Sequence, residues 1–184
     1  MGDTRNRLIQ KTASFLTKKG YFGTGIREIL QETGIPKGSL YHHFPMGKVE
    51  LAKEALIFNG KIMNQKFIEA MQGKSATEAL KGIVNVLQNE LIESKFSYGC
   101  PLATVTLEVS GEEEDLQSVC GEMYQNWENA LTEFLTRRGD PNPRKSAKFF
   151  LIALEGAFVL SKATRDASYM ELVKDQITNI IKSN

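Results

Sequence analysis

The sequence predicts an all-α protein with an N-terminal three-helix domain and a larger C-terminal helical domain. Apolar residues recur at helical spacing in nearly every segment, and the alternation typical of strands is hardly visible. The capping pattern Ser-x-x-Glu begins at Ser75, Ser110 and Ser168, and Asn142-Pro143 marks a further helix start. With 184 residues, 41% of them apolar, the chain can bury one large core or two small ones.

Turn residues divide the chain into nine predicted helices. The first begins at Asp3, whose carboxylate can cap it, and ends at Gly20. Two short helices follow before residue 46, and Pro36 and Pro45 bound the second of them. The other six are predicted near residues 48–71, 76–95, 102–109, 112–138, 143–165 and 169–182. Because the first of these six joins the short helices to the remainder, we expect one domain over residues 1–47 and another over residues 48–184.

The apolar stretches are too short to span a membrane. The longest, Phe149–Leu160, has 10 apolar residues in 12 and would extend over roughly 18 Å at the helical rise of about 1.5 Å per residue. The first residues are polar and lack the apolar stretch of a secretory signal. We therefore expect a cytoplasmic protein with no membrane partner.

The histidines and cysteines form no recognisable metal or catalytic motif. Cys100 and Cys120 lie 20 positions apart without a CxxC pattern, which indicates free thiols. His42 and His43 are adjacent, so on a helix their side chains diverge by about 100°. A GxGxxG or phosphate-binding loop is also missing from the sequence. We predict no metal, no cofactor and no enzyme activity, and a redox role for the cysteines stays open.

Positive charge is concentrated at the N-terminal end. Residues 1–60 hold 9 Lys and Arg against 5 Asp and Glu, whereas residues 61–184 hold 14 against 17. A basic end on an otherwise slightly acidic chain indicates that a polyanion contacts that end only.

Two short amphipathic helices in this basic end predict a helix-turn-helix. Thr24 or Gly25 can cap the first, which ends at Gly34, and the second starts at Lys37 after a proline. The second helix turns Leu40 and Phe44 inward, with Gly38, Ser39 and His42 opposite and Tyr41 and His43 on the flanks. Serine, lysine and histidine can hydrogen-bond base edges in the major groove, and a tyrosine hydroxyl can reach a phosphate. An ordinary surface helix is the alternative interpretation.

Two blocks of this region, residues 20–29 and 34–45, resemble the DNA-binding domain of TetR-type transcriptional repressors. The resemblance implies a recognition helix at residues 37–43 and matches Lys37, Ser39, Tyr41, His43 and Lys48 to positions that touch DNA. The other residues that we expect to contact DNA are Thr24, Arg27, Gly38 and His42. The turn before Lys48 has one residue more than the commonest form of that turn, which leaves the reach of Lys48 open.

The helix predicted at residues 143–165 is apolar around nearly its whole circumference, which indicates burial on all sides. A domain of this size has few internal helices to cover it, and small residues such as Gly156 permit close approach of another helix. A DNA reader with two-fold symmetry also needs a partner. We therefore expect a homodimer through the last two helices, with a central core helix in a monomer as the alternative.

Aromatic and soft side chains in the middle helices predict a ligand pocket. Residues 100–102 and 155–157 also resemble the TetR-type regulators that control drug-resistance genes. The resemblance implies a small apolar or aromatic effector bound among these helices. The residues expected to bind it are Phe96, Cys100, Met123, Tyr124, Trp127 and Phe158. For each of these, packing in an ordinary core is the alternative.

The predicted function is that of a DNA-binding transcriptional regulator. We expect a dimeric repressor that binds a double-stranded DNA operator and leaves it when the effector binds. One alternative is an all-helical carrier or enzyme acting on an apolar small molecule, but the middle helices show no paired catalytic groups. A DNA-binding protein without an effector is the other alternative.

Overall fold

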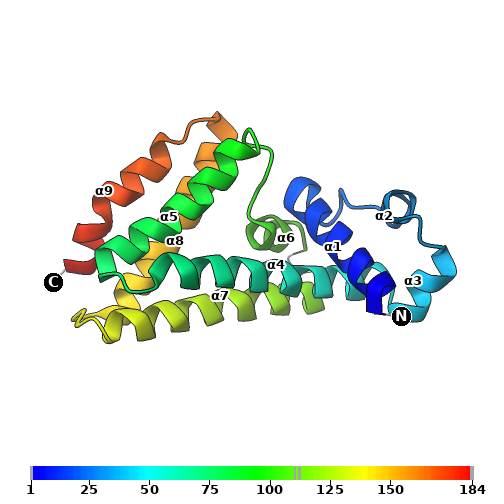
Figure 1. Ribbon diagram of the computed structural model, residues 1–184, viewed down its shortest axis with the longest axis horizontal. Coiled ribbons are helices and arrows are strands. Elements are labelled where there is room, and N and C mark those ends of the chain that lie inside the picture. The colour runs from blue at the N-terminus through cyan, green and yellow to red at the C-terminus, as the bar shows by residue number, and fades with distance from the viewer. Residues whose placement is uncertain (1, 110, 112, 183–184) are drawn as a thin grey trace. The chain divides into compact units, whose positions relative to one another are not determined.

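The computed structural model describes residues 2–109, 111 and 113–182, and these residues form helices and no strands (Figure 1). The predicted all-α class is therefore confirmed. The six later helices begin and end within two residues of their predicted bounds. The helices are α1 (Gly2–Lys19), α2 (Ile26–Thr33), α3 (Lys37–His43), α4 (Lys48–Met71), α5 (Ala76–Glu93), α6 (Pro101–Val109), α7 (Glu114–Thr136), α8 (Pro143–Thr164) and α9 (Ser168–Lys182).

Glycines with positive φ end the first two helices, as the sequence predicted. Gly20 follows α1 at φ 70° and Gly34 follows α2 at φ 67°, a backbone region that favours glycine. The expected cap at Asp3 is wrong, because Asp3 lies inside the first turn of α1. Its carboxylate there still complements the positive end of the helix dipole.

Of the predicted capping boxes, the one at Ser75 is confirmed and the one at Ser168 is wrong. Ser75 and Glu78 form the predicted capping box at the start of α5, with both reciprocal hydrogen bonds present. Ser110 lies outside the described residues. The box predicted at Ser168 is wrong, because the carboxylate of Asp166 accepts from both the backbone N–H and the hydroxyl of Ser168. A nearer acid has thus taken the capping role at α9.

The chain divides into two compact units. Unit 1 comprises Met1–Ile62 with Pro101–Met123, and unit 2 comprises Met63–Cys100 with Tyr124–Asn184. Unit 1 therefore contains the N-terminal triplet together with α6 and the first parts of α4 and α7. The domain boundary expected between residues 47 and 48 stays a prediction.

The core of unit 1 holds the short helices in place. Leu8 of α1, Ile29 of α2 and Leu40 of α3 are all fully buried in one cluster. Phe44, directly after α3, and Leu51 of α4 are buried in the same cluster. Because α3 contributes its apolar face to this core, its opposite face is left for solvent or a partner.

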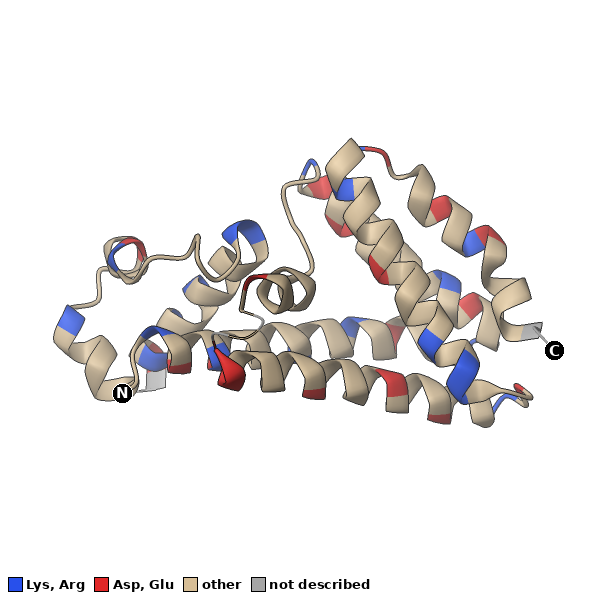
Figure 2. Ribbon diagram, turned by 180° about the vertical axis from the view of Figure 1, so that it is seen from behind, with Lys and Arg blue, Asp and Glu red and all other residues tan. Residues whose placement is uncertain are grey.

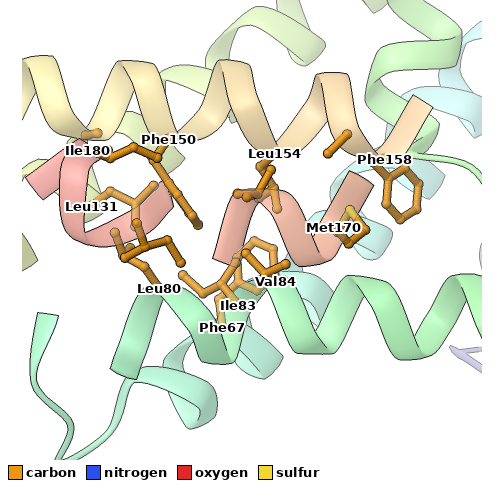
Figure 3. Packing of buried hydrophobic residues seen from close by; sticks show 14 of the residues in the cluster. Phe67, Leu80, Ile83, Val84, Leu131, Phe150, Leu154, Phe158, Met170 and Ile180 are labelled. Atoms are coloured by element: carbon orange, nitrogen blue, oxygen red, sulfur yellow. The ribbon is translucent and has the colours of Figure 1, made fainter. Parts of the chain in front are cut away.

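The core of unit 2 is built from α5, α8 and α9 with contributions from α4 and α7. Phe150 and Leu154 of α8 point toward Ile83 and Val84 of α5, and Met170 of α9 joins them (Figure 3). These side chains are buried, so apolar burial is the main stabilising contribution to the unit.

One side of α8 remains uncovered in the single chain. Phe149, Ile152 and Val159 are 56%, 70% and 49% exposed, while Phe150 and Phe158 are buried. This agrees with the expectation that the helices of its own chain cover only one side of α8, while the partner that would bury the other side stays a prediction. Among the described helices, none is long and apolar enough to cross a membrane.

We predict that Leu80→Ala lowers the free energy of unfolding by about 2–5 kcal/mol, because it leaves a cavity at a fully buried position of α5. The adjacent Lys81 is exposed, so Lys81→Ala should change it by at most about 0.5 kcal/mol. Urea unfolding followed by circular dichroism measures both variants. Equal shifts in the two midpoints would contradict the assigned core.

Candidate nucleic-acid interface and effector cluster

Helices α2 and α3 form the predicted helix-turn-helix. The turn between them contains Gly34, Ile35 and Pro36, and the buried Ile35 anchors it in the core of unit 1. Pro36 is the residue before α3, with φ −63°. The fixed φ of proline suits this position, because a helix can begin directly after it.

The outer face of α3 is exposed as the sequence predicted. Gly38 and His42 are exposed, Tyr41 is 42% exposed, and Ser39 and His43 are half-buried. The side chain of Lys37 lies with its Nζ 5.8 Å from the centre of the Tyr41 ring. The face therefore presents hydrogen-bonding groups and one positive charge close together.

An open groove of about 770 Å³ runs along α2 and α3. Arg27 and Gln31 of α2 line it together with Lys37 and Tyr41 of α3. Basic residues also occur on α1, so each helix of the triplet carries positive charge (Figure 2). The groove thus places two cations and a phenol where the sequence predicted contacts with DNA.

Thr24 does not belong to this exposed face. Its side chain is buried, and its hydroxyl donates to the backbone carbonyl of Gly20. The residue before α2 is Gly25, which makes no side-chain cap. The turn between α1 and α2 thus already uses the Thr24 hydroxyl, and the expected contact of Thr24 with DNA stays a prediction.

Lys48 begins α4 and lies against an aromatic ring. Its Nζ is 4.1 Å from the centre of the Tyr21 ring, a cation–π geometry. Burial lowers the pKa of Lys48, and the nearby charges of Glu108 and Glu113 act in the opposite direction. The phosphate contact of Lys48 stays a prediction. Within unit 1 its ammonium lies against Tyr21 and near the charges of Glu108 and Glu113.

Glu108 of α6 contacts the turn after α1, and the sequence analysis did not predict this contact. Its Oε2 accepts from the backbone N–H groups of Tyr21 and, at 3.3 Å, of Phe22. A Cβ added at Gly20 would lie only 2.2 Å from its Oε1. Gly20 is therefore required both by its positive φ and by the closeness of this carboxylate.

Tyr21 completes this part of unit 1. The Tyr21 hydroxyl donates to Oε1 of Glu113 over 3.4 Å. Burial, followed by the charge and hydrogen bond of Glu113, raises the pKa of Tyr21 to about 12. The phenol therefore stays protonated at neutral pH and serves as a donor. The turn after α1 is thus tied to the segment at and after α6.

A second cluster lies within unit 2. The Tyr124 hydroxyl of α7 donates to Oε1 of Glu155 over 2.9 Å, and the Cys100 thiol donates to the same oxygen over 3.2 Å. The ring of Trp127 meets Tyr124 edge-on at 5.7 Å between centroids and Phe67 at 5.8 Å. The structure thus brings together three of the predicted effector residues.

The other predicted effector residues fall in different surroundings. Phe158 is buried in the core of unit 2, and the half-buried Phe96 packs against that core. Met123 belongs to unit 1, where its Cε occupies the space that a Cβ on Gly60 would need. Their binding role stays a prediction.

Glu155 and Phe67 are cluster members that the sequence analysis did not nominate. Burial raises the pKa of Glu155, although its hydrogen bonds with Cys100 and Tyr124 oppose this shift. Burial is also the largest cause of the raised pKa of Tyr124. Among the described residues, no group of histidines, cysteines and carboxylates has the arrangement of a metal site.

Comparison with known proteins decides between the interpretations of this fold. Residues 8–55 match the family described as bacterial regulatory proteins of the tetR family. Residues 76–176, more than half of the chain, match the family described as transcriptional regulator LmrA/YxaF-like, C-terminal domain. The chain belongs to the TetR family of transcriptional regulators.

Individual relatives agree with this assignment to the TetR family. The HTH-type transcriptional regulator LmrA of Bacillus subtilis is 31% identical, over 98% of each chain. The regulator YxaF of the same organism is 29% identical, over 98% of this chain and 96% of its own. A TetR-family crystal structure from Cytophaga hutchinsonii shares the fold, with a TM-score of 0.86 and 24% identity over 98% of this chain and 94% of that one.

Membership in the TetR family confirms the predicted function at the level of a DNA-binding transcriptional regulator. The N-terminal match covers both helices of the helix-turn-helix, α2 and α3. The family and its named relatives are described as transcriptional regulators.

We predict that Glu108→Ala destabilises this TetR-family protein, lowering the free energy of unfolding by about 1–3 kcal/mol. The physical reason is that the Tyr21 and Phe22 N–H groups lose their acceptor. Glu108→Gln is the matched variant, because its amide oxygen can still accept and its loss should be smaller. Urea unfolding measures both, and equal losses would contradict an acceptor role for Glu108.

Proposed function

We propose that the protein is a dimeric repressor that releases its operator when a small effector binds in unit 2. The observation that carries this proposal is the exposed face of α3 beside Arg27 in a chain of the TetR family. As a regulator of chromosomal DNA, the protein acts in the cytoplasm.

The recognition helix in this proposal is α3. Lys37, Ser39 and His42 contact base edges in the major groove, and Tyr41 donates its hydroxyl to a phosphate. Arg27, His43 and Lys48 add contacts at the edges of the same surface. Gly38 supports this docking because a residue without a side chain lets the helix backbone lie close to DNA.

The dimer in this proposal forms through α8 and α9. Apolar side chains on these helices are exposed in the single chain, among them Phe149 and Ile152 of α8 and Leu172 of α9. Gly156 is also exposed, and a Cβ added there would meet no atom within 4 Å. An apolar helix face with a small residue at its centre suits the close packing of two identical helices.

The effector in this proposal binds beside Tyr124 and Trp127. Both residues are half-buried, so each is partly accessible to a ligand. An effector that binds better to the protein off DNA than on DNA shifts the population by that difference in affinity. Titration of Trp127 fluorescence with aromatic compounds tests whether such a ligand binds.

The DNA-binding proposal is tested by selecting duplexes from a random library and measuring their affinity by fluorescence anisotropy. We expect the selected duplex to bind roughly a thousandfold more tightly than a scrambled one, with an affinity that falls steeply as salt rises. Equal, weak affinity for both duplexes would overturn the proposal.

Variants of α3 separate its predicted roles. Tyr41→Phe should weaken binding to all duplexes alike if the hydroxyl meets a phosphate. Lys37→Ala and His42→Ala should each cost about 1–3 kcal/mol on the selected duplex and relax its sequence preference, because they remove base contacts. Lys81→Ala, a lysine variant on α5 in unit 2, is the control and should leave anisotropy unchanged. Unchanged binding in all three α3 variants would show that the docking is wrong.

The dimer proposal is tested by placing one charge on α8. Ile152→Glu should convert the dimer to a monomer in analytical ultracentrifugation, because the side chain is 70% exposed on the proposed interface. Leu107→Glu is the matched control, since Leu107 is 81% exposed on α6 of unit 1. If Ile152→Glu stays dimeric, or Leu107→Glu alone dissociates, the interface lies elsewhere.

A further inference from the structure

Glu155 has one carboxylate oxygen that the protein satisfies and one that it does not. Oε1 accepts from the Tyr124 hydroxyl and the Cys100 thiol. Oε2 is buried and has no hydrogen-bond partner among the described residues. A buried polar atom without a partner is unfavourable, whereas the same atom paired with a donor is not.

No cation of the described chain neutralises this carboxylate. The lysines and arginines of unit 2 that form ion pairs do so with other acids, such as Lys66 with Glu90 and Lys174 with Glu171. Burial raises the pKa of Glu155, since its charged form has lost solvation without gaining a counter-ion. A positive ligand group at Oε2 would supply the missing donor and the missing charge together.

Aromatic rings accompany the carboxylate. Tyr124, which binds Oε1, meets Trp127 edge-on, and Trp127 meets Phe67. Faces of indole and phenol rings attract cations, and their area packs well against an aromatic ligand. Tyr124 therefore links the carboxylate to Trp127 on the same helix, α7, and through Trp127 to Phe67 of α4.

A purely structural role explains only half of this arrangement. Tyr124 and Cys100 need an acceptor in a largely apolar interior, and Oε1 provides it. A glutamine would provide the same acceptor without a buried charge. The carboxylate and its unpaired Oε2 thus remain unexplained by packing, and they differ from what an apolar effector alone would need.

We propose that the effector is an arylalkylamine in its protonated form, whose ammonium group donates to Oε2 of Glu155 while its rings pack on Trp127 and Tyr124. This inference rests on the proposed ligand-responsive function and names the ligand class of the same site. The sequence analysis expected an apolar or aromatic effector, and the inference adds a positive charge to it.

The test uses matched pairs of compounds with one to three fused aromatic rings, in which each primary arylmethylamine is paired with the corresponding arylmethanol. Isothermal titration calorimetry on the full-length protein gives the affinity for each member. We expect at least one amine to bind about tenfold or more tightly than its alcohol, because only the amine brings a charged donor to Oε2. If no amine in the series exceeds its alcohol, the inference is overturned.

Three variants assign the preference to Glu155. Glu155→Gln keeps an acceptor for Tyr124 and Cys100 but removes the charge, so the amine preference should disappear while alcohol binding persists. Glu155→Leu removes both oxygens and is used if the glutamine variant does not fold; the amine preference should disappear in it as well. Glu133→Gln, the same change at an exposed position of α7, should keep the preference. Persistence of the preference in a folded Glu155 variant would overturn the inference.

Release of the selected duplex separates this inference from the proposed function. Alcohols that bind and release DNA as well as the amines would uphold a ligand-responsive repressor and refute the amine specificity. Amines that bind through Glu155 without releasing DNA would uphold the inference and refute the proposed response. If no compound of either class binds, the amine inference fails, and DNA binding is judged by its own assay.

Discussion

The burial of Leu40 and Phe44 is the interaction on which the DNA-binding surface depends. A helix of seven residues such as α3 is too short to be stable alone in water. Both side chains are fully buried in the core of unit 1, which compensates for the entropy lost in ordering the helix. The same burial fixes which face of α3 is turned outward, so the core residues determine the position of groups that they never touch.

Glu108 and Glu155, whose hydrogen bonds the sequence analysis did not predict, have two different roles. The carboxylate of Glu108 is used by the backbone of the turn after α1, where it accepts from neighbouring N–H groups. The carboxylate of Glu155 is used only in part by its own unit. Oε2 of Glu108 stabilises a turn of its own unit, whereas Oε2 of Glu155 is left with the hydrogen-bonding capacity that the proposed ligand would use.

The local signals in the sequence predicted the helices well and the contacts between them poorly. Local backbone geometry explains the effects of Gly20, Gly34 and the prolines around α3, so these effects can be predicted without the tertiary structure. The capping box at Ser168 failed because Asp166 competes locally for the same groups. The pairing of Glu108 with Tyr21 joins residues 87 positions apart, which no local pattern reports.

Gly20 and Gly38 differ in how much sequence change they permit. At Gly20 any side chain would meet the Glu108 carboxylate and an unfavourable φ, so substitution there damages the fold itself. At Gly38, the second residue of α3, an added Cβ meets nothing within 4 Å. Substitution of Gly38 by a residue with a side chain should therefore have little effect on the stability of the fold. If Gly38 meets DNA as proposed, the fit to DNA and not the stability of the fold limits which residues this position can accept.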